Sequence, residues 1–182
     1  MNLPECFELI PGYLSSPTNA SNTPGVDWEQ PTIRMFGKVR NVPRLTKWYG
    51  EAGYTYSGIE NRPEPMPVWL DVIRQRVQET AGARFNSALL NLYRGGGDSI
   101  AWHADDEREL GTDPTIASLS IGARRTFKIR HNATREVWSL NLGGGDLLIT
   151  RGEAQRLYQH SLPKTSAPVG HRINITFRLI HP

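Results

Sequence analysis

The stretch Arg172-Ile173-Asn174-Ile175-Thr176-Phe177-Arg178, near the end of the chain, alternates strictly between polar and apolar side chains. Side chains of a β-strand point to opposite faces in turn, so the stretch predicts a strand with one apolar and one polar face. The polar face carries Arg172 and Arg178, whose planar guanidinium groups suit carboxylates. We therefore expect this strand to clamp an anion such as a short dicarboxylate, with an ordinary solvated strand as the simpler alternative.

The rest of the chain is also rich in β-type patterns. Short apolar runs separated by Gly and Pro turn signals predict strands at residues 32–35, 88–93, 99–105, 115–121, 126–130, 136–140, 147–150 and 157–160. One segment differs, because Trp69, Val72, Ile73 and Val77 recur at helical spacing up to Gly82. Many short strands with a covering helix favour an antiparallel sandwich or barrel.

Length and composition set the broad class. The 182 residues correspond to one domain, which we expect to span residues 1–182 as a monomer. The single cysteine, Cys6, excludes a disulfide framework and fits a reducing compartment, either the cytoplasm or, in a eukaryote, the nucleus. No apolar run of 18 residues and no secretory signal is visible, so we expect no membrane association.

Charge is small in total but unevenly distributed. The net charge is +3, yet residues 31–50 carry five basic side chains and no acid, and residues 124–135 carry another five and no acid. Acidic residues gather instead between residues 105 and 113. Basic surface around an acidic centre predicts a polyanionic partner, although an ordinary solvated surface explains the charge pattern equally well.

Three residues form a candidate metal site. His103 and Asp105 would point the same way on the predicted strand at residues 99–105, and His160 is the best third ligand. Two histidines and one carboxylate form the facial triad of non-haem Fe(II) oxygenases, while a hydrolytic zinc site uses the same donors. Each residue alone has an ordinary explanation, as a polar strand residue, a turn acid or a core histidine. Together with the arginine strand they favour a metal centre beside an anion clamp.

Neighbouring segments supply further candidates. Asn91 and Tyr93, two residues apart on a predicted strand, would add hydrogen bonds to the anion clamp. Residues 15–26 consist of Ser, Thr, Asn, Pro and Gly almost throughout, which predicts an irregular segment. Phe36 lies at a basic turn near Gly37, where an aromatic ring suits a wedge or stacking group against bases. The alternative is that Phe36 is a core aromatic residue and that the bounds predicted for its strand are wrong.

Taken together, several motifs resemble one known family over residues 28–182. The motifs are Asn91-Leu92-Tyr93, His103-Ala104-Asp105-Asp106-Glu107, Ser118-Leu119-Ser120-Ile121-Gly122, Gln159-His160-Ser161-Leu162-Pro163-Lys164 and Arg172-Ile173-Asn174-Ile175-Thr176-Phe177-Arg178. They resemble those of the AlkB-type Fe(II)- and 2-oxoglutarate-dependent nucleic-acid dealkylases. Residues 43–51 are most similar to the branch that contains the two nuclear repair members of animals.

The resemblance implies a fold and a set of site residues. The fold is mainly β with flanking helices, around a double-stranded β-helix (jelly-roll) core. The implied iron ligands are His103, Asp105 and His160. The implied 2-oxoglutarate contacts are Asn91, Tyr93, Arg172, Asn174, Thr176 and Arg178. The implied substrate contacts are Phe36, Arg44, Tyr56, Asp106 and Glu107, with a nucleotide-recognition lid at residues 28–60.

The resemblance also implies a reaction. Fe(II), 2-oxoglutarate and O2 would oxidatively demethylate N1-methyladenine and N3-methylcytosine in DNA, or in RNA, with release of formaldehyde and succinate. Both bases are cationic, so the carboxylates of Asp106 and Glu107 would favour them over undamaged bases. Two alternatives remain, an oxygenase of RNA or protein on the same core and a DNA-binding module without catalysis. In the family a helix usually precedes the strand that leads to the residue matching Phe36. This chain has residues 15–26 in that place.

The resemblance predicts a strand-state effect at Phe36. Phe36→Ala should lower turnover of a methylated duplex about tenfold relative to single-stranded substrate, because filling the gap of a flipped base matters only in a duplex. Initial rates on matched single- and double-stranded oligonucleotides test this, with Val39→Ala as the control. Equal losses on both substrates would remove the wedge role.

Overall fold

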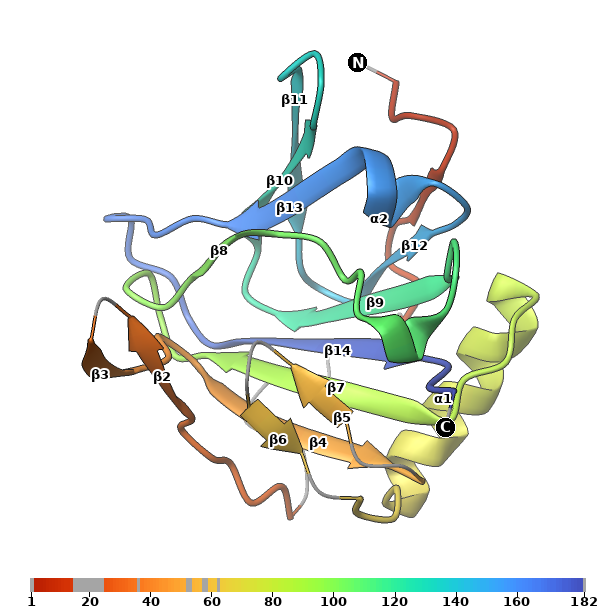
Figure 1. The fold of residues 1–182 in the computed structure, drawn as a ribbon, viewed down its shortest axis with the longest axis horizontal. Coiled ribbons are helices and arrows are strands. Elements are labelled where there is room, and N and C mark those ends of the chain that lie inside the picture. The colour runs from red at the N-terminus through yellow and green to blue at the C-terminus, as the bar shows by residue number, and fades with distance from the viewer. Residues whose placement is uncertain are drawn as a thin grey trace.

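The computed structural model describes residues 2–14, 25–35, 37–51, 54–56, 59–61 and 63–181. Strands dominate these ranges, with one long helix and one short helix (Figure 1). In chain order the elements are β1 (Phe7–Ile10), β2 (Thr32–Met35), β3 (Lys38–Asn41), β4 (Leu45–Gly50), β5 (Tyr54–Tyr56), β6 (Ile59–Asn61), α1 (Val68–Ala81), β7 (Ser87–Tyr93), β8 (Ile100–His103), the 3-10 helix η1 (Arg108–Leu110), β9 (Ile116–Gly122), β10 (Arg125–His131), β11 (Val137–Leu142), β12 (Asp146–Thr150), α2 (Ala154–Leu157), β13 (Tyr158–Leu162) and β14 (Arg172–Arg178).

Two antiparallel sheets face each other. One has six strands in the order β1-β12-β9-β14-β7-β4, and the other has four in the order β11-β10-β13-β8. Figure 1 shows the four-stranded sheet above the six-stranded one. The sequence-based prediction of an antiparallel barrel or sandwich is therefore confirmed. Within the described ranges, no helix is long and apolar enough to cross a membrane.

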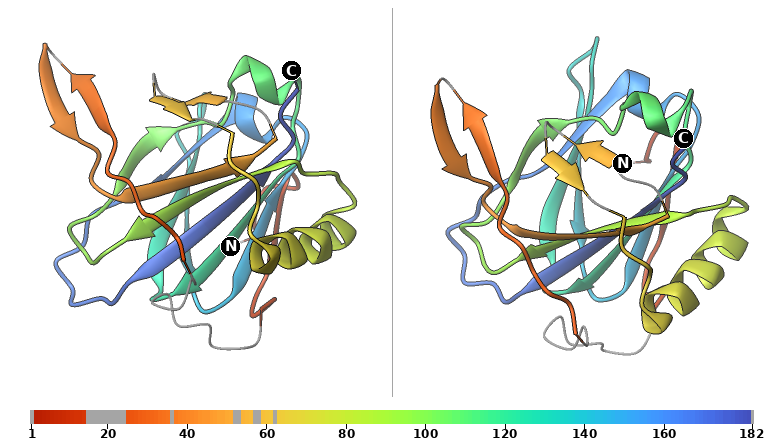
Figure 2. Two further views of the ribbon diagram at one scale, coloured as in Figure 1. Left: turned by 90° about the horizontal axis from the view of Figure 1, so that it is seen from below. Right: turned by 60° about the horizontal axis from the view of Figure 1, so that its bottom comes forward.

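Strand β14 lies inside the six-stranded sheet and is buried on both faces. Its apolar side chains, Ile173, Ile175 and Phe177, belong to a core cluster that includes Leu70 and Val77 of α1. Helix α1 therefore covers the outer face of this sheet, as Figure 2 shows. The opposite, polar face of β14 lines a cavity between the sheets. The alternative of a solvated strand is wrong, because the polar residues face the interior of the barrel.

Helix α1 ends where its periodic pattern stops. Gly82 has the left-handed φ of 62°, and its N–H donates to the carbonyl of Gln78, which closes the helix. Strand β1 was not predicted from the sequence, since its four residues show no clear alternation. Its Phe7 joins a second core cluster with Ile129, Trp138 and Leu148, and Phe7 and Leu148 also line the cavity between the sheets.

The glycines at residues 95–97 allow two loops to touch. A Cβ atom on Gly96 would overlap the carbonyl oxygen of Thr165, whose N–H donates to the Gly96 carbonyl at 3.0 Å. Buried Arg125 joins the same loops, because its guanidinium donates to the carbonyls of Gly95 at 2.8 Å and Pro163 at 2.8 Å. These contacts hold the loop before β8 against the loop before β14.

Two small hairpins belong to the segment predicted as a lid. Hairpins β2–β3 and β5–β6 stand on the same side of the molecule as the segment after β8 (Figure 2). The predicted irregular segment at residues 15–26 lies outside the described residues, except for Gly25 and Val26. Val26 packs against the core cluster beneath α1.

The carboxylate of Asp146 connects the N-terminal segment to the turn before β12. Asp146 is buried and accepts hydrogen bonds from the N–H groups of Gly12 at 2.9 Å and Gly143 at 3.3 Å, and from Arg124 Nη1 at 2.7 Å. Burial alone would raise the pKa of Asp146. The hydrogen bonds from Gly12, Gly143 and Arg124 outweigh burial, so this pKa lies below its ordinary value.

We expect Asp146→Asn to lower the free energy of unfolding at pH 7 by about 1–3 kcal/mol, because an amide nitrogen cannot accept these bonds. Since the folded pKa is depressed, this stabilisation is present above the ordinary pKa of 3.8 and is lost as pH falls through the folded pKa. Denaturant unfolding at pH 7 and pH 3 should show the difference between the proteins shrinking in acid. The control is Glu8→Gln, which removes an exposed pair with Arg151 and should cost less than about 1 kcal/mol. A difference that is constant with pH would contradict the role of the carboxylate.

Candidate metal centre and anion pocket

The structure brings the three predicted metal ligands together. His103, Asp105 and His160 offer ligand atoms that all lie within 4.8 Å of one another. His103 is the last residue of β8 and lies opposite His160 of β13 in the ladder. Their ring centroids are 4.2 Å apart. The three donors therefore come from two paired strands and from the segment that follows the first of them.

The prediction that His103 and Asp105 share one strand is wrong. Strand β8 ends at His103, so strand alternation does not orient Asp105. Two contacts turn Asp105 inward instead. Its N–H donates to Gln155 Oε1 at 3.0 Å, and its Oδ2 accepts from Arg178 Nη2 at 2.8 Å.

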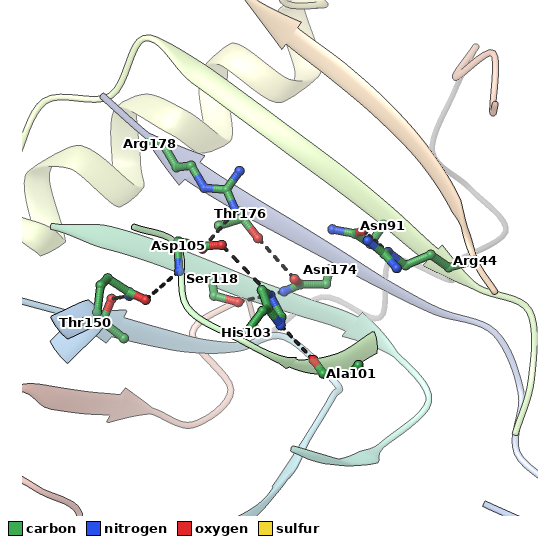
Figure 3. A network of polar contacts seen from close by, with 11 residues as sticks. Arg44, Asn91, Ala101, His103, Asp105, Ser118, Thr150, Asn174, Thr176 and Arg178 are labelled. Atoms are coloured by element: carbon green, nitrogen blue, oxygen red, sulfur yellow. Dashed lines mark hydrogen bonds and ion pairs between the residues drawn. The ribbon is translucent and has the colours of Figure 1, made fainter. Parts of the chain in front are cut away.

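The donor atoms fit a cation. The Nδ1 of His103 lies 2.8 Å from the Ala101 carbonyl, so Nδ1 carries the proton and Nε2 faces Asp105 Oδ1 at 3.9 Å (Figure 3). Asp105 Oδ1 is buried and has no hydrogen-bond partner among the described residues. A buried carboxylate oxygen is costly unless something compensates it, and a metal ion between it and the imidazoles would do so.

The protonation states also suit a metal. Burial, followed by the nearby His103, lowers the pKa of His160 to about 3. Burial would raise the pKa of Asp105, but Arg178 and the two histidines outweigh it and lower that pKa to about 2. Near neutral pH the site therefore offers neutral imidazoles and an ionised carboxylate, which is the form that binds metals.

Arg172 is the centre of a second, anion-binding site. It is fully buried on β14, and its Nη2 donates to Ser120 Oγ at 2.7 Å. Its Nε has no hydrogen-bond partner in the part of the chain that the structure describes, and its Cζ lies 5.4 Å from the centroid of the Tyr93 ring. Burial lowers the pKa of Arg172 to about 10, so the side chain stays charged at neutral pH. A buried, unpaired guanidinium indicates an anionic ligand.

The other predicted anion contacts lie along the polar face of β14 and on the neighbouring strand β7, and Arg178 among them pairs with Asp105. In the sheet ladder, Tyr93 lies opposite Arg172 and Asn91 lies opposite Asn174. Thr176 Oγ1 donates to Asn174 Oδ1 at 3.1 Å, and Asn174 Nδ2 donates to Ser118 Oγ at 2.7 Å (Figure 3). Because these polar groups come from adjacent strands, they form one continuous polar wall.

A single cavity joins the two sites. Its lining includes the three triad residues, together with Asn91, Tyr93, Asn174, Thr176 and the arginines 172 and 178. Ser118 and Gln155 also line it, although neither was predicted as a site residue. Ser118 carried a signal, because it is a polar residue between apolar ones in the predicted strand at residues 115–121. Gln155 carried none, because it lies in a one-turn helix with no periodic pattern.

The predicted substrate residues differ in how deeply they are buried. Arg44 is buried, and its Nε donates to Asn91 Oδ1 at 2.7 Å. Asp106 is exposed, and Glu107 is half-buried at the start of η1. Phe36 and the side chain of Tyr56 lie outside the described residues, so their roles remain predictions.

Comparison with known proteins agrees with this geometry. The sequence model of the 2OG-Fe(II) oxygenase superfamily matches residues 8–178. The chain belongs to this superfamily. Such oxygenases use Fe(II) and 2-oxoglutarate, and the triad and the Arg172 pocket fit that pair.

Two curated relatives support the predicted AlkB-type resemblance. The human alpha-ketoglutarate-dependent dioxygenase alkB homolog 3 is 43% identical over 169 residues, covering 86% of this chain and 58% of that protein. The mouse DNA oxidative demethylase ALKBH2 is 41% identical over 160 residues, covering 82% of this chain and 67% of that protein. The chain thus spans 58% of the human relative's length. The resemblance is confirmed.

A solved structure supports the fold. The structure of OsALKBH1 superposes with a TM-score of 0.61 at 17% sequence identity, covering 98% of this chain and 100% of that chain. At this identity the likeness concerns the fold alone, and it confirms the predicted jelly-roll core.

Arg172→Met should weaken 2-oxoglutarate binding by roughly 30-fold or more, because truncating one partner of a buried charge pair costs about 2 kcal/mol at least. Calorimetric titration of the Mn(II)-loaded protein without O2 measures this. Arg76→Met, which removes an exposed arginine on α1, is the matched control and should leave the affinity unchanged. Unaltered affinity in the Arg172 variant would place the co-substrate elsewhere.

Proposed function

We propose that this protein is a DNA dealkylase that demethylates N1-methyladenine and N3-methylcytosine, using Fe(II), 2-oxoglutarate and O2. One observation carries the proposal: a two-histidine, one-carboxylate cluster and a buried, unpaired arginine line the same cavity. The relatives' names add support, since one is a DNA oxidative demethylase. We further propose a monomer of one domain over residues 1–182, working in the cytoplasm or nucleus.

Each polar group of the cavity has a proposed role. His103, Asp105 and His160 hold the iron, and Arg172 binds a carboxylate of 2-oxoglutarate with help from Asn91 and Tyr93. With these groups bound, the iron, O2 and 2-oxoglutarate supply oxidation of the N-methyl group, which leaves as formaldehyde while succinate and CO2 form. The protein itself positions the reactants and excludes water.

Arg178 and its neighbours tune the electrostatics of the site. Arg178 donates to Asp105 Oδ2 at 2.8 Å, which keeps that carboxylate ionised and leaves Oδ1 directed toward the histidines. Thr176 and Asn174 hold each other beside it, so the polar wall needs little rearrangement when co-substrate binds.

The substrate side of the proposal rests on charge. Exposed Asp106 and half-buried Glu107 directly follow the proposed metal ligand Asp105 in the sequence. A methylated adenine or cytosine carries a positive charge that these carboxylates would attract. On the lid, Lys38 and Arg40 of β3 are exposed and suit phosphate groups of a nucleic acid.

The decisive experiment is a lesion panel. Oligonucleotides of DNA and RNA, single- and double-stranded, each with one N1-methyladenine, are incubated with protein, Fe(II), 2-oxoglutarate and O2. We expect formaldehyde and succinate in equal amounts from DNA, and neither from His160→Ala. If the protein is folded and binds metal but yields neither product, the proposal is overturned. If only RNA is turned over, the proposed substrate becomes RNA instead of DNA.

Asp106→Asn should lower kcat/KM for N3-methylcytosine about fivefold, equivalent to the roughly 1 kcal/mol that a nearby charge contributes in water. Turnover of an uncharged lesion, N3-methylthymine, should change little. Glu79→Gln, an exposed acid on α1, is the control for overall charge. Equal effects on charged and uncharged lesions would show that Asp106 does not read the charge of the base.

A further inference from the structure

The side chain of Gln155 connects three segments around the metal centre. It is 5% exposed and belongs to the one-turn helix α2. Its Oε1 accepts the N–H of Asp105 at 3.0 Å, and its Nε2 donates to Thr150 Oγ1 at 3.0 Å. Because a backbone N–H can only donate, the contact with Asp105 fixes which end of the amide faces it.

Helix α2 connects Gln155 rigidly to the second histidine. The helix ends at Leu157 and β13 begins at Tyr158, so no loop separates Gln155 from His160. The N–H of Leu157 donates to the Glu153 carbonyl at 2.8 Å, which closes the turn. The partner on the other side, Thr150, is the last residue of β12. Gln155 is thus anchored to both sheets.

Asp105 depends on this anchor more than the histidines do. His103 and His160 lie in paired strands, whereas Asp105 follows the end of β8, beyond the ladder. Arg178 holds its carboxylate from one side at 2.8 Å, and Gln155 holds its backbone. The salt bridge acts on the carboxylate and the Gln155 contact acts on the main chain, so the two contacts hold different parts of Asp105.

We propose that Gln155 is a positioning residue for the metal centre. Its hydrogen bond ties the main chain of Asp105 to α2, which runs directly into β13. The carboxylate of Asp105 and the imidazole of His160 thereby stay close enough to bind one ion. This inference rests on the proposed metal centre, and it adds a residue that acts through its hydrogen bond to Asp105. Groups that orient metal ligands commonly contribute ten- to a hundredfold in metal affinity.

The test compares two variants that break different bonds of the same amide. Gln155→Met keeps the length of the side chain but removes both hydrogen bonds, whereas Thr150→Val removes only the partner of Nε2. Mn(II) affinity, measured by calorimetry without O2 or 2-oxoglutarate, is the main readout. Thermal unfolding of the metal-free proteins reports stability separately.

We expect Gln155→Met to weaken Mn(II) binding about 10- to 100-fold. Thr150→Val should lower the melting temperature but change Mn(II) affinity by less than about threefold, since the Asp105 contact survives. If both variants lose affinity in step with their melting temperatures, Gln155 acts only through stability and the inference fails. Should Gln155→Met not fold, Gln155→Asn, whose amide is one methylene too short to reach Asp105, must show the same selective loss.

Failure of the inference can be told apart from failure of the metal centre. His160→Ala should abolish Mn(II) binding, whereas wild-type protein should bind one ion. If wild-type protein binds no Mn(II), or His160→Ala binds it equally well, the metal centre itself is misplaced. If those two behave as expected and Gln155→Met binds like wild type, only the role of Gln155 is overturned.

Discussion

The buried ion pair between Arg178 and Asp105 is the contact on which the rest of the site depends. Both side chains are almost fully buried, at 2% and 3% exposure, and their atoms lie 2.8 Å apart. Removing either partner would leave an uncompensated charge in the interior, which is strongly destabilising. The pair also joins the six-stranded sheet, through β14, to the segment that carries the carboxylate of the triad.

A barrel with a polar interior needs its hydrophobic core elsewhere. In this chain the apolar face of β14 points outward and is covered by α1, while a second apolar cluster forms around Ile129 and Leu148. The interior wall can then carry arginine, asparagine and threonine, because each is hydrogen-bonded or faces the cavity. Core stability and chemistry thus use opposite faces of the same strand, and the strict alternation at residues 172–178 serves both.

Local patterns predicted the elements whose signal is periodic. Helix α1 ends at Ala81 before Gly82, and β2 at Thr32–Met35 has the predicted bounds. Errors arose where contacts distant in sequence decide the conformation. Strand β8 ends at His103, whereas the prediction continued it to residue 105. Leu157 is the last residue of α2, although it was predicted to begin a strand. Strand β1 pairs with β12, a strand about 140 residues later in the chain, so its partner is not visible in its own four residues.

Periodicity and side-chain chemistry, which act over a few residues, were enough to predict the β-rich class, the covering helix, the alternation of the last strand and the donor types of the site. How the donors meet depends instead on contacts between distant segments. His103 and His160 become neighbours through pairing of β8 with β13, and Asp105 joins them through Gln155 and Arg178, residues 50 or more positions away. No local pattern can encode such contacts, because they exist only when both sheets have closed around the cavity.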